Sequence, residues 1–188
     1  MSTSTHHHDE ILYRQDGRLH DELRDLTTKL SFCNYADGSA QVTMGFTKVI
    51  ALVHGPKESS SRQLATDKDG GQLKISYNTT SFCRGKQMAE SKRSHRNVEF
   101  ASTLRDVFDT VLMVEQYGGS EIVVEVTVIA DDGGAKSVAI NAVTLALIDA
   151  GIGMREYVVS ATTGVVNNKA CADVCWSERK AGEFPLAV

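Results

Sequence analysis

The stretch from Glu121 to Arg155 constrains the fold more than any other part of the chain, because it joins a buried strand to an apolar helix through a glycine pair. An Asp-Asp-Gly-Gly run at 131–134 separates the two elements. The part before this run is apolar and largely β-branched, which predicts a strand buried near the centre of a sheet. Its apolar residues are Ile122, Val123, Val124, Val126, Val128 and Ile129.

The part after the glycine pair predicts a helix that starts near Ala135 and ends at Gly151. It is apolar almost all round, which is typical of a core helix. Its thin polar stripe consists of Ser137, Asn141 and Thr144. Because a helix N-terminus directs free backbone N–H groups outward, the glycine pair is either an anion site or an ordinary turn.

The composition is that of a single globular domain. With 41% hydrophobic and 23% charged residues over 188 positions, the chain can bury one core. The polar residues 1–10 predict a disordered tail, and 11–188 a single α+β domain. No apolar run reaches the length of a membrane span, so we expect no membrane partner. Because no CxxC pair occurs, four cysteines are interpreted as reduced thiols of an intracellular protein: Cys33, Cys83, Cys171 and Cys175.

Further elements follow from alternation and helical spacing. Strands are expected at 30–35, 40–44, 47–53, 73–79, 157–166 and 170–176. One apolar face at helical spacing predicts a helix that buries Val98, Ala101, Leu104, Phe108, Val111 and Leu112. An alternating pattern begins at Phe184 and is still running at Val188, so we expect an interrupted strand, with the C-terminal part of the domain missing.

The densest positive segment lies at 84–96 and contains a single acidic residue, Glu90. Its basic residues are Arg84, Lys86, Lys92, Arg93, His95 and Arg96. In a chain of net charge −4, such a cluster is either a phosphate-binding patch or a solvated loop before a helix. Arg93 and Arg96 are three apart and would share a face if the helix has begun there.

A late acidic group consists of Asp173, Glu178 and Glu183. Carboxylates near a phosphate cradle can hold a metal or act as acid and base. Arg179 and Lys180 lie between them, which favours a surface turn instead. Asp37 and Asp149, at a turn and a helix end, are most simply structural.

Several motifs in chain order resemble the RNase PH family. The resemblance covers nearly the whole chain from about Leu12 onward. The motifs are Asp16–Arg24, Ala36–Ala40, Gly45–Val49, Val53–Pro56, Lys92–Arg96, Ala130–Gly134 and Leu147–Ile152. Within the family, the Lys-Arg-Ser-His segment at 92–95 and the Leu-Ile-Asp-Ala-Gly-Ile segment at 147–152 are most similar to a ring subunit of the exosome.

This resemblance implies an α+β fold of mixed sheets packed with helices. It also implies a six-membered ring of RNase PH-like subunits with a central RNA channel, cap subunits, a hydrolytic nuclease as partner, and residence in nucleus, nucleolus and cytoplasm. Active family members degrade RNA from the 3′ end by phosphorolysis. Lys92, Arg93 and Arg96 match positions where the family's basic residues face single-stranded RNA.

The sequence departs from the family's active pattern at two places. After Gly133 and Gly134, active members carry a hydroxyl residue and an arginine, whereas this chain has Ala135 and Lys136. Alanine lacks the hydroxyl, and lysine cannot form the bidentate fork of arginine.

Active members also carry two aspartates six apart in the segment matching 178–188. Here those positions hold Arg179 and Pro185, and only a two-residue gap would bring Glu183 to one of them. Asp173 does match a family aspartate. The sequence therefore predicts a non-catalytic RNA-binding ring subunit without metal or cofactor, and the alternative is an active phosphorolytic exoribonuclease.

Overall fold

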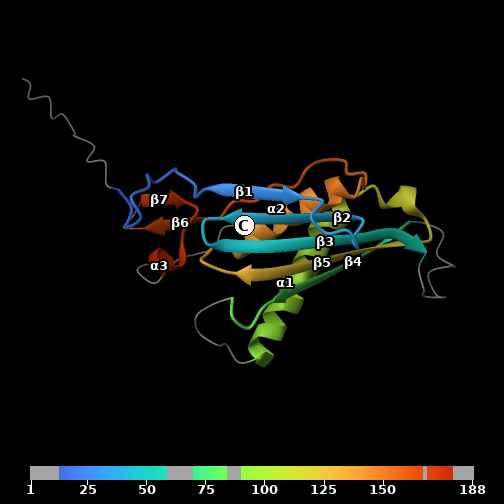
Figure 1. The fold of residues 1–188 in the computed structure, drawn as a ribbon, viewed down its shortest axis with the longest axis horizontal. Coiled ribbons are helices and arrows are strands. Elements are labelled where there is room, and N and C mark those ends of the chain that lie inside the picture. The colour runs from blue at the N-terminus through green and yellow to red at the C-terminus, as the bar shows by residue number, and fades with distance from the viewer. Residues whose placement is uncertain (1–12, 59–69, 84–89, 167–168, 180–188) are drawn as a thin grey trace, which may run out of the picture.

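A five-stranded mixed sheet forms the centre of the fold (Figure 1). The computed structural model describes residues 13–58, 70–83, 90–166 and 169–179. In sheet order the strands are β1 (Leu26–Leu30), β2 (Gly38–Met44), β3 (Thr47–Glu58), β5 (Ser120–Ala130) and β4 (Gln72–Thr79). Only the β4–β5 pair is parallel. As predicted, the run after Glu121 forms an inner strand of this sheet.

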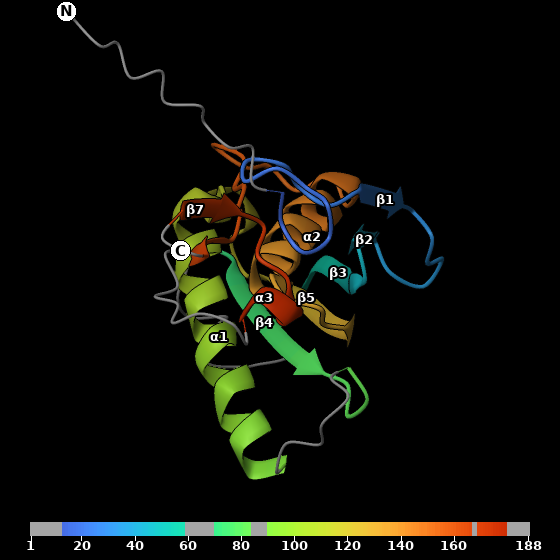
Figure 2. The same cartoon turned by 90° about the vertical axis from the view of Figure 1, so that its left-hand side faces the viewer.

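Two helices, α1 (Glu90–Val111) and α2 (Ala135–Asp149), cover the same face of the sheet (Figures 1 and 2). Strand residues alternate between this covered face, where side chains are buried, and an open face, where they are half-exposed. The buried strand residues include Val49, Ala51, Val53, Val124, Val126 and Val128. Among the described residues, no helix is both long and apolar enough to cross a membrane.

Helix α2 agrees with its prediction in position and burial, and Gly151 adopts a left-handed φ of 68° at its end. The polar stripe has a specific use, because it holds the segment that follows the helix. Asn141 donates to the carbonyl of Ser160 at 2.9 Å and accepts from its amide at 2.8 Å. Thr144 donates to the carbonyl of Val158 at 2.7 Å. The helix is thus buried between the sheet and this segment.

The predicted strands at 157–166 and 170–176 were too long. The structure has a small antiparallel pair, β6 (Thr163–Val166) and β7 (Lys169–Ala172). The residues before β6 bond to α2 side chains instead of a neighbouring strand. Beyond β7, Asp173 adopts a positive φ of 51°, which ends the strand. A short helix α3 (Trp176–Arg179) follows, and a 3₁₀ turn, η1 (Val114–Tyr117), precedes β5.

The first hairpin also differs from its prediction, since its first strand is β1 at Leu26–Leu30 instead of 30–35. Ser31 has a positive φ of 48°, which turns the chain out of the sheet. The structural reading of Asp149 is confirmed, because its carboxylate accepts from the amides of Ser31 at 3.2 Å and Ser39 at 2.8 Å. Asp37 likewise accepts from the amide of Gly55 at 2.7 Å.

Strand β3 continues to Glu58, through the His54–Pro56 segment that was expected to stop it. A register shift between His54 and Lys57 accommodates this segment within the pairing to β5. At its first residue, Gly38, strand β2 passes very close to α2. A Cβ on Gly38 would lie 2.3 Å from the carbonyl oxygen of Ala146, so only glycine fits there.

The buried face of α1 was predicted only in part. Its deepest residues are Phe100, Leu104 and Phe108, and buried Leu112 follows directly after the helix at the same spacing of four. Phe100 was not expected in this set, and Val98 is 68% exposed instead of buried. The N-terminal end of α1 projects beyond the sheet (Figure 2). Val98 lies at a groove between α1 and β4 instead of in the core. Residues 1–10 and the alternation from Phe184 to Val188 lie outside the described residues.

The fully buried Phe108 and the exposed Val98 on the same helix provide a matched pair of substitutions. We expect Phe108→Ala to lower the free energy of unfolding by about 3–5 kcal/mol, because it removes a core ring and leaves a cavity. Val98→Ala should change it by no more than about 0.5 kcal/mol. Urea denaturation followed by far-UV circular dichroism measures both, and similar effects would show that α1 packs in another register.

Candidate functional site

The glycine pair forms a tight turn between β5 and α2, where Gly133 and Gly134 have positive φ values of 101° and 72°. A Cβ on Gly133 would lie 2.6 Å from the carbonyl oxygen of Val174, so a side chain is excluded there. Thr47 fixes the turn from β3: its hydroxyl donates to the carbonyl of Gly133 at 2.8 Å and accepts from the amide of Asp132 at 3.0 Å.

The N-terminus of α2 has no side-chain cap, since the cap position is Gly134. Its first-turn N–H groups and the helix dipole therefore favour an anion in front of the turn. Built onto Gly134, a Cβ would lie 3.3 Å from the Thr162 hydroxyl and 3.5 Å from Nη2 of Arg24. The Thr162 hydroxyl shares a hydrogen bond of 2.7 Å with Ser137. Hydroxyl and guanidinium groups thus still border the turn.

The two residues at the start of α2 do not complete this site. The side chain of Ala135 is buried and has no donor. The ammonium of Lys136 lies 5.0 Å from the centroid of the Phe100 ring, within the range of a cation–π contact with α1. In this structure, the side chain of Lys136 therefore contacts α1.

Asp173 lies beside the glycine turn and is held by Arg24. Nε and Nη2 of Arg24 donate to the two carboxylate oxygens at 2.8 and 2.6 Å, and its backbone amide adds a third bond at 2.9 Å. Arg18 donates to the same carboxylate at 3.3 Å. Burial acts to raise the pKa of Asp173, but these hydrogen bonds and the charge of Arg24 outweigh it and lower that pKa below its usual value.

Glu178 is held in the same way by a different arginine. Nε and Nη2 of Arg14 donate to its two oxygens at 2.7 and 2.6 Å, and both side chains are 1% exposed. The amide of Cys175 adds a bond at 3.0 Å. Burial opposes ionisation, yet the hydrogen bonds from Arg14 and Cys175 lower the pKa of Glu178 to about 2. Of the predicted acidic group, two members therefore serve in ion pairs, and Glu183 lies outside the described residues.

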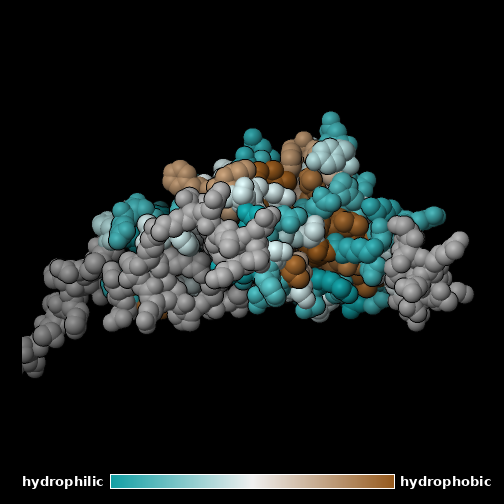
Figure 3. Space-filling view, turned by 90° about the horizontal axis from the view of Figure 1, so that it is seen from below, coloured by the Kyte–Doolittle hydropathy of each residue, from teal (hydrophilic) through white to brown (hydrophobic). Residues whose placement is uncertain are grey.

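The basic segment is described only in part. Arg84 and Lys86 lie outside the described residues, as does the side chain of Lys92. Helix α1 has begun by Arg93 and Arg96, as the spacing argument required. Arg93 is half-buried and lines a groove between α1 and β4, whereas Arg96 is exposed. Figure 3 looks onto this side of the molecule, where polar and apolar residues lie side by side.

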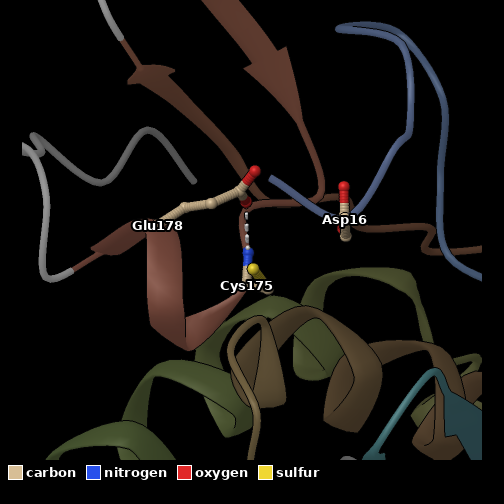
Figure 4. Close-up of side chains that lie close together, drawn as sticks. All are labelled: Asp16, Cys175 and Glu178. Atoms are coloured by element: carbon tan, nitrogen blue, oxygen red, sulfur yellow. Dashed lines mark hydrogen bonds between the residues drawn. The ribbon is translucent and has the colours of Figure 1, made fainter. Parts of the chain in front are cut away.

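A group of possible metal ligands, Asp16, Cys175 and Glu178, lies within 4.8 Å (Figure 4). Both oxygens of Glu178 already accept from Arg14, and Asp16 accepts from Nε of Arg18 at 2.6 Å. A divalent cation would therefore lie against two guanidinium groups. This charge arrangement disfavours a metal at the cluster.

Sequence reasoning did not single out the groups that organise the site: Arg14, Arg18, Arg24, Thr47 and Thr162. Two of them, Arg18 and Arg24, belong to the opening motif at 16–24, where they carried no assigned role. Their partner Asp173 lies 149 residues after Arg24 and 155 residues after Arg18. A pairing at that distance leaves no periodic signal in one sequence.

Comparisons with known proteins find relatives along most of the chain. The model of the 3′ exoribonuclease family, domain 1 (RNase PH), matches residues 22–153. The chain is 33% identical to the human exosome complex component RRP41 over 176 residues, which cover 94% of this chain and 72% of that protein. It is 35% identical to the Arabidopsis thaliana RRP41 homolog over 175 residues, covering 93% and 72%. It is 34% identical to Rrp41 of the archaeon Pyrobaculum arsenaticum, covering 93% and 71%.

A solved structure supports the fold independently. The crystal structure of rice Rrp46 superposes with a TM-score of 0.76 at 24% identity, covering 89% of this chain and 76% of that one. The match includes most of the described elements, so the sheet and its two covering helices follow a known arrangement.

The buried Arg14–Glu178 pair makes stability depend on pH. Because the folded pKa of Glu178 is lowered to about 2, its contribution is complete above the ordinary value of 4.5 and is lost as pH falls toward 2. Glu178→Gln should lower the free energy of unfolding by about 3–5 kcal/mol at pH 7, since it leaves a buried guanidinium unpaired. The difference from wild type should shrink as pH falls.

Urea titrations from pH 7 to pH 2.5 measure this difference. Glu115→Gln is the matched control, because Glu115 forms an exposed ion pair of 2.6 Å with Arg155 and should contribute less than about 1 kcal/mol. If the difference in unfolding free energy between wild type and Glu178→Gln stays constant with pH, the lowered pKa of Glu178 in the folded state is contradicted.

Proposed function

The chain belongs to the RNase PH family of 3′ exoribonucleases, and we propose that it is a non-catalytic subunit of an exosome core ring. One observation carries the non-catalytic part. At the start of α2, where family members that phosphorolyse RNA carry a hydroxyl and an arginine, Ala135 has no donor and Lys136 lies over Phe100. The phosphate nucleophile would therefore lack two of its ligands.

The acidic residues support the same proposal. The carboxylates of Asp173 and Glu178 are each held by an arginine fork, which stabilises their ionised forms. With its pKa lowered to about 2, Glu178 is a poor general acid at neutral pH, and the lowered pKa of Asp173 acts in the same direction. In the proposed subunit, these two carboxylates therefore stabilise the fold.

Phosphorolysis is the second candidate function, and specific features favour it. The N-terminus of α2 is uncapped, Arg24 lies beside the glycine turn, and the hydroxyls of Ser137 and Thr162 are close by. Together they could still attract phosphate in front of the turn. What the arrangement lacks is a ligand set that orients the phosphate for attack.

The assembly proposal is supported by the relatives, which are named exosome complex components, and by the surface of this chain. Around edge strand β1, large apolar side chains are exposed, up to 82% for Phe46. The group consists of Leu23, Leu26, Leu30, Phe32, Tyr35 and Phe46. A patch of this kind fits an interface between subunits.

In the assembled particle, this chain would occupy one place in a ring of six RNase PH-like subunits. Cap subunits and a hydrolytic nuclease would be the further partners, and the particle would act in nucleus, nucleolus and cytoplasm. The basic segment, with Arg84, Lys86, Lys92, Arg93 and Arg96, would lie along the path of single-stranded RNA. Such residues neutralise phosphates and position RNA without reading its sequence.

The catalytic part of the proposal predicts no phosphate-dependent release of nucleoside diphosphates by a ring that contains this chain. The assay incubates the ring with single-stranded RNA in phosphate and in phosphate-free buffer and separates the products by chromatography. Lys136→Ala is the matched variant, because it removes the only side-chain cation of the first two α2 residues. Diphosphate release that requires phosphate and disappears in Lys136→Ala would show that this chain is an active enzyme.

The RNA part predicts that Arg96→Glu weakens binding of single-stranded RNA by the ring for all sequences alike. The slope of log affinity against log salt concentration should also become shallower by roughly 0.7, the value for one lost contact on a single strand. Arg105→Glu, on the same helix and 56% exposed at its side chain, is the matched control and should leave the slope unchanged. Equal behaviour of the two variants would exclude Arg96 from the RNA path.

A further inference from the structure

The turn that follows β4 presents one large aromatic side chain to solvent. It spans residues 80–83, and the side chain of Phe82 within it is 71% exposed. Because β4 and β5 are parallel, this turn lies at the same end of the sheet as the glycine turn before α2 (Figure 1). Loops that follow neighbouring parallel strands commonly line ligand sites. The position of Phe82 therefore places it beside the candidate site.

The turn is anchored to β5 and to the glycine turn on both sides of Phe82. Before it, the amide and the hydroxyl of Thr80 donate to the carbonyl of Val128 at 3.1 and 3.0 Å. After it, the amide of Cys83 donates to the carbonyl of Thr80 at 3.3 Å, which closes the turn. The carbonyl of Cys83 accepts from the amide of Asp131 at 3.0 Å. Phe82 is thus held in a fixed backbone setting although its side chain is exposed.

The exposure of this ring contrasts with its aromatic neighbours along the chain. The described aromatic rings of β4 and α1 are buried in the core, and they belong to Tyr77, Phe100 and Phe108. Within the turn, Phe82 follows the polar residues Thr80 and Ser81. An interface between proteins usually gathers apolar side chains into a larger patch, as the group around β1 does at the opposite edge of the sheet. One ring beside polar residues suits a flat ligand instead.

The same end of the sheet also favours a phosphate. The N-terminus of α2 is uncapped, so its first N–H groups and the helix dipole favour an anion in front of the glycine turn. This anion site and the exposed ring are joined through the bond between Asp131 and Cys83. An inorganic anion would use only the first feature, and an apolar side chain only the second. A nucleotide uses both, because it combines a phosphate with a flat base.

We propose that Phe82 stacks against a base of single-stranded RNA whose backbone passes in front of the glycine turn. This inference rests on the proposed function as an RNA-binding subunit and assigns a base contact to it. Every base has a flat face, so stacking tolerates all sequences. The contact involves no ion, so it contributes nothing to the salt dependence that phosphate contacts cause.

The affinity of the full chain for a labelled twelve-residue oligoadenylate, measured by fluorescence anisotropy, tests the contact. Phe82→Ala should weaken binding at least about fivefold, the effect of losing one stacked base. Phe82→Leu, which keeps an apolar side chain without a ring, should weaken it similarly, and Phe82→Trp should preserve or strengthen it. Tyr157→Ala is the matched control, since Tyr157 is also 71% exposed but lies on the segment along α2, and it should bind as wild type does.

An oligonucleotide of abasic sites with the same number of phosphates separates stacking from charge. Wild type and Phe82→Ala should bind it equally. Oligoadenylate should quench the tryptophan emission of Phe82→Trp more than that of wild type, whose single tryptophan is Trp176, and the abasic strand should not. Wild-type affinity in Phe82→Leu, an equal loss in Tyr157→Ala, or weakened abasic binding in Phe82→Ala would overturn the proposal.

The salt dependence distinguishes failure of this inference from failure of the proposed function. Phe82→Ala should lower the affinity for oligoadenylate at every salt concentration and leave the slope of log affinity against log salt concentration unchanged. A shallower slope would show that Phe82 acts through phosphate contacts, which would overturn the stacking assignment. If Phe82→Ala binds as wild type does while Arg96→Glu still weakens binding by the ring, the inference fails and the proposed function stands.

Discussion

The side chain of Arg24 connects three parts of the chain that are distant in sequence. Its guanidinium binds both oxygens of Asp173 after β7, and it donates to the carbonyls of Asp132 at 3.1 Å and Gly133 at 3.0 Å in the turn before α2. A planar guanidinium can serve all of these acceptors at once because its donors lie in a fixed fork. The shape of the candidate site depends on this one residue.

This arrangement decides how the acidic residues can act. A buried carboxylate is tolerated only when it is paired and hydrogen-bonded, and both Asp173 and Glu178 meet this condition through arginines. Freeing either one for chemistry would leave a guanidinium buried without its partner. Together with Ala135 and the Lys136–Phe100 contact, this is the physical basis of the proposal that the chain is a scaffold and a binding surface.

Sequence reasoning predicted the elements whose periodicity is strong. Strand β4, the strand before the glycine pair and helix α2 agree with expectation, because continuous apolar or alternating runs specify them locally. It failed where tertiary contacts decide. The positive φ at Asp173 shortened the strand predicted at 170–176, and the positive φ at Ser31 ended the first strand where it was expected to begin. Val98 was expected to be buried and is exposed.

The site itself could be located but not understood from the sequence. The glycine pair and the late acidic group were both found, yet their partners Arg14 and Arg24 could not be assigned, because ion pairs across such separations leave no local pattern. The different exposure of Arg93 and Arg96 was also out of reach, since spacing on a helix does not say which residue lies nearer to β4.

A double-mutant cycle between Arg24 and Asp173 tests most directly the claim that the carboxylates here are structural. Arg24→Gln, Asp173→Asn and the double variant are compared by urea unfolding at pH 7. We predict a coupling free energy of about 2–3 kcal/mol, the upper part of the range for residues in one network. The account would be contradicted if the changes in unfolding free energy of the two single variants summed to that of the double variant within about 0.5 kcal/mol. The two residues would then stabilise the fold independently.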